Sequence, residues 1–142
     1  EAKKRAGVTG KVIGLCGSEK SAHRLEELGF CDHIFTADAT VPVPVLEKIE
    51  EITGGQLCDI TINNVNIPDT EMTSILCTKD SGTAYFFSMA TSFTKAALGA
   101  EGVGSDVTMI VGNGYTKGHA EITLQLLRES DSLRKVFTEL YA

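Results

Sequence analysis

The chain has 142 residues, of which 42% are hydrophobic and 23% charged, the proportions of an ordinary globular domain. This length predicts one domain with a core that needs no metal or disulfide staple. The formal net charge is −6, and basic residues are interleaved with acidic ones along the chain. Nucleic acid and anionic membranes attract basic surfaces, so neither is an expected partner. We therefore expect a small molecule or another protein as the partner.

The cysteines form no CxxC motif and have no His or Cys neighbour at the spacing of zinc ligands. They stand at positions 16, 31, 58 and 77. No signal peptide opens the chain and no apolar run approaches the length of a membrane span. We expect no metal site, reduced thiols and a cytoplasmic location. The chain begins at Glu1 rather than at Met, in a charged stretch typical of a helix end, which predicts an upstream segment of the same protein.

Short apolar runs alternate along the chain with amphipathic stretches. Strands are predicted at residues 11–16, 33–37, 58–65, 83–87 and 107–111. Helices are predicted from a Ser18 cap to Leu28, from Pro42 or Pro44 to residue 53, after an Asp69 cap, and as one or two helices after Gly118. Residues 80–82 are predicted to be a turn. Parallel strands need crossovers that shield the sheet, so this alternation predicts an α/β protein with a doubly wound parallel sheet.

Small, amide and hydroxyl residues follow each predicted strand. In an open α/β sheet the ligand lies beyond the carboxyl ends of the strands, where such residues let it approach the backbone and offer donors and acceptors. The five segments are residues 16–20, 36–39, 63–66, 88–92 and 112–115. Ordinary strand-to-helix turns use the same residue types. One such loop leaves both interpretations open, whereas several together favour a nucleotide ligand.

Three amides in four residues, Asn63, Asn64 and Asn66, form the densest of these clusters. Unpaired amides cannot be buried cheaply, so either a ligand pairs with them or they cap the next helix and close a turn. Candidates for proton chemistry are few: His119 and Tyr115 lie near a predicted strand end, and His23 falls on a solvated helix face. Because the chain has no GxSxG, HExxH or Walker motif, no catalytic residue is assigned.

Several of these segments resemble one enzyme superfamily. GKVIG at residues 10–14, DITINNV at 59–65 and SGT at 81–83 resemble the cofactor domain of the medium-chain, zinc-type alcohol dehydrogenase superfamily. Residues 83–121 are more specifically similar to one branch, which acts on a diamino acid in lysine fermentation. The resemblance implies oxidative deamination at C3 of a diamino acid by NAD, giving an amino-oxo acid and ammonia. It also implies a homo-oligomer, since homodimers are common in the superfamily.

The superfamily plan implies that part of the domain lies outside this chain. Its sheet order is 3-2-1-4-5-6, with a Gly-rich loop after the first strand. On that plan the strand at 11–16 is the second, so residues 1–142 form a Rossmann-like dinucleotide-binding domain that is N-terminally truncated and lacks the first strand, the Gly-rich loop and the GroES-like substrate domain. The first strand is central, and each buried backbone group left unpaired costs about 1–3 kcal/mol. Without an upstream segment we therefore expect the chain not to hold one regular sheet.

The same plan implies cofactor-binding residues at the strand ends. Those expected at the adenosine ribose and adenine are Gly17, Ser18, Asp38 and Ala39, and those expected along the second ribose and the nicotinamide are Asn64, Asn66, Ser88 and Met89. An NAD site usually has an acidic residue after the second strand. Here Glu19 comes too late, and Lys20 would favour a 2′-phosphate.

NAD is the expected cofactor, with NADP left open. Two other functions stay open as well: an NADPH-dependent quinone or enoyl reductase, and a non-catalytic module that senses a nucleotide.

Overall fold

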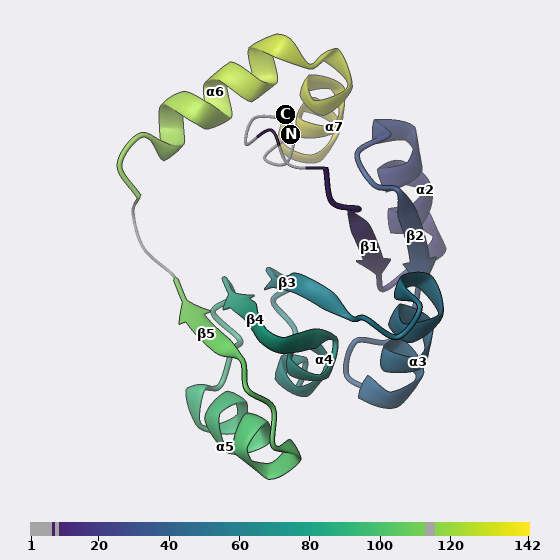
Figure 1. Ribbon diagram of the computed structural model, residues 1–142. Coiled ribbons are helices and arrows are strands. Elements are labelled where there is room, and N and C mark those ends of the chain that lie inside the picture. Colours follow the sequence, from purple (N-terminus) through teal and green to yellow (C-terminus); the bar gives the residue numbers. More distant parts are fainter. Residues whose placement is uncertain (1–6, 8, 113–115) are drawn as a thin grey trace. The chain divides into compact units, whose positions relative to one another are not determined.

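The computed structural model of the chain describes residues 7, 9–112 and 116–142 (Figure 1). It divides into two units, residues 1–36 with 114–142 and residues 37–113. Every strand pair described is parallel. The class is therefore α/β with parallel strands, as the alternation of the sequence predicts. In the part of the chain that is described, no helix is both long and apolar enough to cross a membrane.

A β-α-β step lies in the first unit. Its elements are β1 (Ile13–Cys16), α2 (Glu19–Leu28) and β2 (His33–Thr36). Ile13 lies opposite His33 in the parallel pair. Ser18 caps α2, because its Oγ accepts a hydrogen bond of 3.2 Å from the amide of Ser21. Gly29 ends the helix at a φ of 67°, a left-handed conformation that glycine adopts without strain. Both helix ends confirm the prediction.

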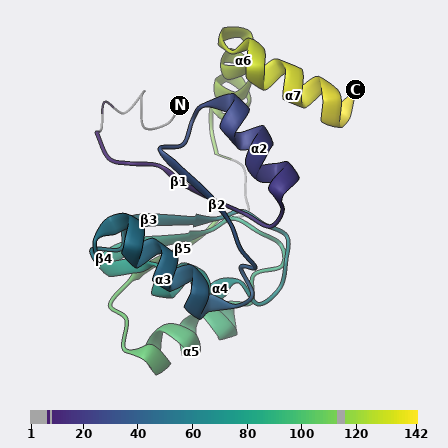
Figure 2. The same cartoon turned by 90° about the vertical axis from the view of Figure 1, so that its right-hand side faces the viewer.

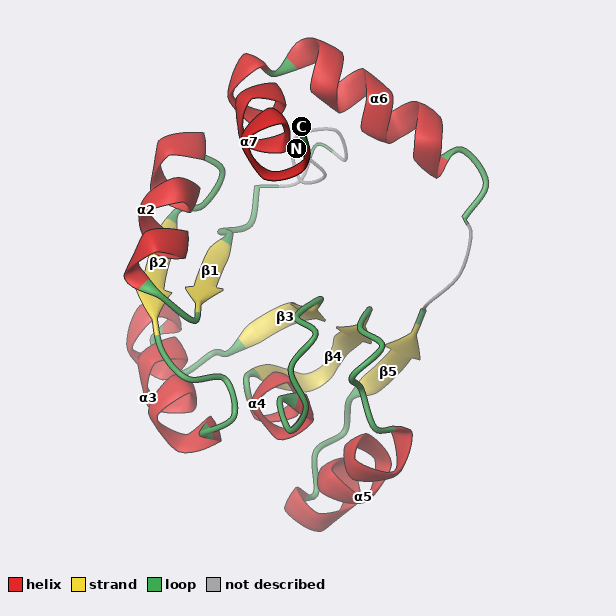
Figure 3. Cartoon of the chain, turned by 180° about the vertical axis from the view of Figure 1, so that it is seen from behind, coloured by secondary structure: helices red, strands yellow, loops and turns green. Residues whose placement is uncertain are grey.

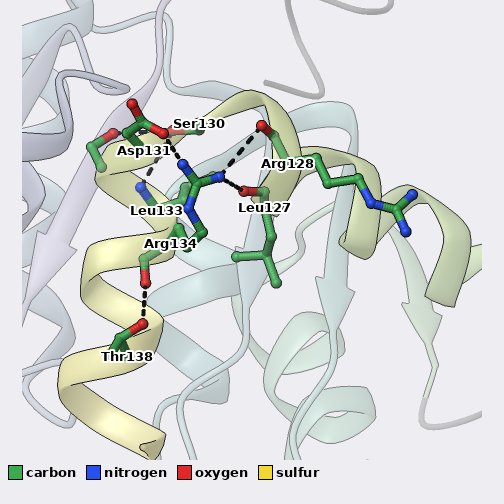
Figure 4. A network of polar contacts seen from close by, with 8 residues as sticks. Leu127, Arg128, Ser130, Asp131, Leu133, Arg134 and Thr138 are labelled. Carbon is green, nitrogen blue, oxygen red and sulfur yellow. Dashed lines mark hydrogen bonds and ion pairs between the residues drawn. The ribbon is translucent and has the colours of Figure 1, made fainter.

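Two helices follow in the same unit, α6 (His119–Glu129) and α7 (Asp131–Tyr141). Figure 4 shows the corner between them, where Arg134 of α7 donates to the carbonyl oxygens of Leu127, at 2.6 Å, and Arg128, at 3.4 Å. Those carbonyls lie in the last turn of α6 and have no partner within that helix. Ser130 ends α6 and caps α7 by accepting from the amide of Leu133. The chain thus forms two helices here, which the sequence had left open.

The second unit places three parallel strands beside one another in the order β3-β4-β5. Figure 3 shows a helix between each consecutive pair of strands. In chain order its elements are α3 (Pro42–Thr53), β3 (Cys58–Asn63), α4 (Glu71–Leu76), β4 (Thr78–Phe86), α5 (Phe93–Val103) and β5 (Thr108–Val111). The strands end in register, Asn63 opposite Phe86 and Phe86 opposite Val111. Their carboxyl ends therefore share one edge of this sheet.

The core of the second unit lies on one face of the three-stranded sheet. Phe86 and Ala84 of β4 and Ile75 of α4 are completely buried, and they pack with Ala96 and Ala100 of α5, which are buried as well. Both helices lie on that side of the sheet in Figures 1 and 2. Side chains alternate between faces along a strand, so the opposite face of β3 carries Ile60 and Ile62, which are 63% and 65% exposed.

The described strands pair within two groups, as expected for a plan that lacks its first strand. β1 pairs only with β2, and β3 pairs only with β4, among the strands described. These are the two groups that remain when the central strand of the order 3-2-1-4-5-6 is taken away. No described segment pairs with the remaining edge of β1 or of β3, as expected for the truncated plan.

Two local predictions were wrong, and one helix was not predicted. Residues 80–82 belong to β4 rather than to a turn, because the amide of Ser81 donates to Asp106 O at 2.6 Å and a register shift absorbs the extra residues. Asp69 does not cap α4, since Thr70 precedes the helix and Asp69 instead pairs with Lys95. Helix α5 was not predicted because two glycines lower its helix propensity. One of them, Gly99, admits the methyl group of Met72, which would lie 3.0 Å from an added Cβ.

Candidate functional site

The first predicted pair, Gly17 and Ser18, follows β1 at the start of α2, and both residues are exposed. Ser18 Oγ lies 2.9 Å from Ser21 Oγ and also accepts the hydrogen bond from the Ser21 amide that caps the helix. The hydroxyl is therefore already part of a helix N-terminus, where the free amides and the helix dipole favour a negative ligand group. Lys20, in the first turn of the same helix, is exposed as well.

The second pair, Asp38 and Ala39, lies in the loop before α3. Asp38 Oδ1 accepts hydrogen bonds from the hydroxyl of Thr40, at 2.7 Å, and from its amide, at 2.8 Å. These two bonds, the side-chain one first, lower the pKa of Asp38 below its ordinary value. The carbonyl of Ala39 accepts from the hydroxyl of Thr73 in α4 at 2.7 Å. The loop is therefore held in shape by its own turn and tied to α4.

The three asparagines after β3 separate into one buried residue and two exposed ones. Asn63 is 7% exposed, and its Nδ2 donates to Thr70 Oγ1, to Thr70 O and to Ser74 Oγ. It closes the turn before α4, one of the two roles left open for the cluster. Asn64 and Asn66 are exposed, with no hydrogen bond from their side chains to other described residues. Their amides are available to a ligand.

Ser88 and Met89 lie in the segment between β4 and α5. Ser88 Oγ accepts a hydrogen bond of 3.1 Å from the amide of Ala90, and the Ser88 carbonyl oxygen accepts one of 3.3 Å from the amide of Thr91. Met89 is 94% exposed. The segment starts with the amide of Phe87 bound to Asn63 O at 2.7 Å. A compact turn therefore presents a fully exposed apolar side chain beside the end of β3.

Buried polar residues gather around α4, a feature that sequence reasoning missed. All those described lie between residues 63 and 78, namely Asn63, Thr70, Glu71, Thr73 and Thr78. Glu71 Oε1 accepts from the amide of Ser92 at 2.6 Å, and Thr73 reaches Ala39 as stated above. An acid in the first turn of a short helix is typically exposed, so the sequence carries no signal for this role.

In the second unit, hydrogen bonds to or from Thr70, Glu71 and Thr73 hold three loops to α4. These loops carry six of the eight predicted residues: Asp38, Ala39, Asn64, Asn66, Ser88 and Met89. Gly17 and Ser18 belong to the first unit. Tyr115 lies outside the described residues. His119 begins α6, with its Nδ1 2.8 Å from Thr116 O, and His23 is an exposed helix residue beside Glu26 and Glu27.

The cysteines offer no activated nucleophile. All four are free thiols. Burial raises the pKa of Cys16, Cys31 and Cys58, and it is the largest of the causes that raise the pKa of Cys77 to about 12. Within residues 7, 9–112 and 116–142, no three His, Cys, Asp or Glu side chains are gathered so as to hold a metal ion.

No family model matches the chain. Two curated proteins named L-erythro-3,5-diaminohexanoate dehydrogenase are similar to it over 99% of its length. The protein from Acetoanaerobium sticklandii is 60% identical and that from Fusobacterium nucleatum subsp. nucleatum is 55% identical. The chain spans 41% of the length of each of these relatives.

Solved structures match the fold at low sequence identity. AibC superposes with a TM-score of 0.62 at 14% identity, over 84% of this chain and 32% of its own. A quinone oxidoreductase from Pseudomonas syringae pv. Tomato DC3000 gives 0.58 at 19%, over 90% and 40% of the two chains. A mycobacterial protein complexed with NADPH gives 0.60 at 15%, over 92% and 41%. The chain therefore has a Rossmann-like α/β fold and resembles, over nearly its whole length, a part of L-erythro-3,5-diaminohexanoate dehydrogenases.

Proposed function

We propose that the chain is the dinucleotide-binding part of an NAD-dependent dehydrogenase. The reaction is the oxidative deamination of L-erythro-3,5-diaminohexanoate to 5-amino-3-oxohexanoate and ammonia, in lysine fermentation. The observation that carries the proposal is the identity of 60% over 99% of the chain with a protein of that name. The parallel strands β3 and β4, which are followed by the exposed amides of Asn64 and Asn66 and the half-buried hydroxyl of Ser88, support it independently.

The proposed reaction removes a hydride from C3 of the substrate and a proton from its amine, which leaves an imine. Water then adds to the imine carbon, and ammonia departs to give the ketone. The nicotinamide ring supplies the hydride acceptor, so the task of this part of the protein is to bind and orient the dinucleotide. The residues that act on the substrate belong, in this proposal, to the part of the relatives that the chain does not span.

The exposed polar loops fit a dinucleotide. Asn64 and Asn66 offer amides for the hydroxyls of the nicotinamide ribose, and Ser88 and Met89 lie in the neighbouring loop, where the apolar side chain of Met89 suits the face of a ring. In this proposal Gly17 and Ser18 contact the adenosine ribose, and Asp38 and Ala39 lie near adenine.

We also propose that an upstream segment of the same protein supplies a central strand. β1 and β3 each pair on one side only among the described strands, so each has a free edge of amides and carbonyls. A strand that pairs with both edges would restore one parallel sheet and would bring the Gly-rich loop to its carboxyl end. A GroES-like substrate domain would precede it, residues 1–142 being part of the dinucleotide-binding domain.

NAD is the proposed cofactor, and NADP is the alternative that the residues after β1 offer. The resemblance to the branch favours NAD, whereas Lys20 and the N-terminal amides of α2 that Ser18 leaves unpaired would suit the 2′-phosphate of NADP. The quinone oxidoreductases are less than 25% identical and support the fold alone, so a quinone reductase is not favoured. We also propose a cytoplasmic location, since free thiols are typical of reducing compartments. A homo-oligomer is proposed because homodimers are common in the superfamily that the chain resembles.

The experiment uses the full-length protein that contains this chain. NADH and NADPH are titrated by fluorescence, and ammonia release from L-erythro-3,5-diaminohexanoate is assayed with NAD. Asn64→Ala and Ser88→Ala should each weaken NADH binding, by about three- to tenfold for one lost hydrogen bond. Gln56→Ala and Ser105→Ala, which change the same residue types before β3 and before β5, should not. Unchanged binding in both site variants would reject the site, and absence of deamination would reject the activity.

A further inference from the structure

Glu71 is unusual for a glutamate because its side chain is almost completely buried. It begins α4 and is only 3% exposed. Glutamate is almost never fully buried unless it is paired, since a carboxylate removed from water loses its hydration. Its Oε1 accepts a hydrogen bond of 2.6 Å from the amide of Ser92. Bonds from an amide to a charged carboxylate are shorter and stronger than those between neutral groups.

The partner amide belongs to the residue that caps α5. Ser92 Oγ accepts a hydrogen bond of 3.3 Å from the amide of Lys95, and the Ser92 carbonyl oxygen accepts one of 3.0 Å from the amide of Ala96. The amide of an N-cap residue points out of the helix and needs a partner from elsewhere. Glu71 supplies it from another helix. The start of α5 is thereby fixed to the start of α4.

This contact anchors one end of the segment that carries Ser88 and Met89. The other end is held by the bond from the amide of Phe87 to Asn63 O, at 2.7 Å. Asn63 and Glu71 themselves flank the loop that carries Asn64 and Asn66. The two loops proposed to bind the nicotinamide half of the dinucleotide are therefore joined at both ends.

A second link between the same elements is weaker. Asp69 and Lys95 form an ion pair, but their side chains are 58% and 60% exposed, and exposed ion pairs contribute little. Asp69 is the main cause that raises the pKa of Lys95, and Glu71 adds to it. The lysine thus brings a positive charge near the buried carboxylate. Of the two links between α4 and α5, the bond from Ser92 to Glu71 is therefore the stronger.

We infer that Glu71 is a positioning residue for the dinucleotide, whose buried carboxylate sets the distance between the loop of Asn64 and Asn66 and the loop of Ser88 and Met89. This inference rests on the proposed function. Glu71 does not contact the dinucleotide itself. It acts through the amide of Ser92, so its effect depends mainly on where its oxygen lies, and the charge of the carboxylate adds less.

The test uses three variants of the full-length protein. Glu71→Gln keeps an acceptor oxygen at the same distance along the side chain, Glu71→Asp withdraws it by one methylene, and Glu71→Ala removes it. Glu101→Asp is the matched control, an exposed glutamate of α5. The Kd of NADH and the KM of NAD are measured well below the unfolding temperature of every variant, together with kcat.

Glu71→Ala and Glu71→Asp should raise the Kd of NADH and the KM of NAD about tenfold, with a smaller change in kcat. Glu71→Gln should restore both to within about threefold of the unsubstituted protein. A purely structural role would lower the unfolding temperature but leave the Kd of the folded protein unchanged. If Glu71→Ala fails to fold, Glu71→Asp decides.

Wild-type affinity in Glu71→Asp, equal to that of Glu101→Asp, would overturn the inference alone. Failure of the unsubstituted protein to bind either NADH or NADPH would instead overturn the proposed function, and this inference with it. The two failures are distinguishable because the first requires a protein that binds the dinucleotide.

Discussion

The side-chain amide of Asn63, at the end of β3, donates to the hydroxyl of Thr70 across 2.8 Å and so closes the loop between β3 and α4. The same nitrogen donates to Ser74 Oγ at 3.0 Å. Its Oδ1 is buried without a hydrogen-bond partner among the residues described. The loop that carries Asn64 and Asn66 therefore depends on one buried side chain.

Replacing Asn63 should destabilise the protein while replacing Asn66 should not. Asn63→Ala leaves the buried acceptors of Thr70 and Ser74 without their donor, at a cost of about 1–3 kcal/mol in the free energy of unfolding. Asn66→Ala changes an exposed side chain and should stay within about 0.5 kcal/mol. Urea denaturation of the full-length variants, followed by circular dichroism, measures both. Equal midpoints for the two variants would contradict the assignment.

The elements were predictable from sequence where local chemistry decides them. Ser18 and Gly29 bound α2 as predicted, and Gly54 ends α3 with a φ of 65°. The extension of β4 back to Thr78 was not predictable, because it depends on the pairing of Thr78 with Cys58, far away in sequence.

The site was predictable only as a set of loops at strand ends. Residue type distinguishes polar loops from apolar strands, but it did not separate the buried Asn63 from the exposed Asn64. Glu71 was missed because its role depends on Ser92, which only the tertiary structure brings near. Whether the eight predicted residues contact a dinucleotide stays a prediction.

Gly112 should not tolerate a side chain. A Cβ at this position would collide with the hydroxyl of Tyr85 and lie 3.0 Å from its Cζ. Tyr85 is stacked on Phe87, with ring centroids 6.2 Å apart, so moving its ring out of the way would disturb that contact. Gly112→Ala should lower the free energy of unfolding by about 1–3 kcal/mol, the usual cost of overpacking.

The matched control for that substitution is Gly102→Ala, since an added Cβ there meets nothing within 4 Å. A double variant that also carries Tyr85→Leu should recover part of the loss, because the colliding ring is gone. Additive effects of the two substitutions would mean that Gly112 and Tyr85 do not interact.

The carboxyl of Asp38 should titrate below its ordinary pKa of 3.8, because Thr40 donates two hydrogen bonds to its ionised form. Thr40→Val removes the hydroxyl donor and should raise the pKa of Asp38 toward the ordinary value. The folded-state pKa is the lower one, so the stabilisation is complete above pH 3.8 and is lost as the pH falls through the folded pKa. Carboxyl-carbon NMR titration measures the shift. A pKa that Thr40→Val leaves unchanged would contradict the turn described here.

Cys77 should be nearly inert to alkylation in the folded protein. Its pKa of about 12 leaves almost no thiolate at pH 8, and its side chain is buried. Cys31 is only partly buried and should react with iodoacetamide sooner. Mass spectrometry of peptides after timed labelling of the full-length protein gives the order. Labelling of Cys77 before Cys31 would contradict the burial found for that residue.

The structure of the full-length protein with NADH bound tests the central claim most directly. The nicotinamide ribose should lie within hydrogen-bond distance of the loops of Asn64 and Ser88, and the adenosine beside Gly17 and Ser18, with one parallel sheet that includes an added strand between β1 and β3. NADH bound elsewhere, with those loops free of it, would show that the proposed site is wrong.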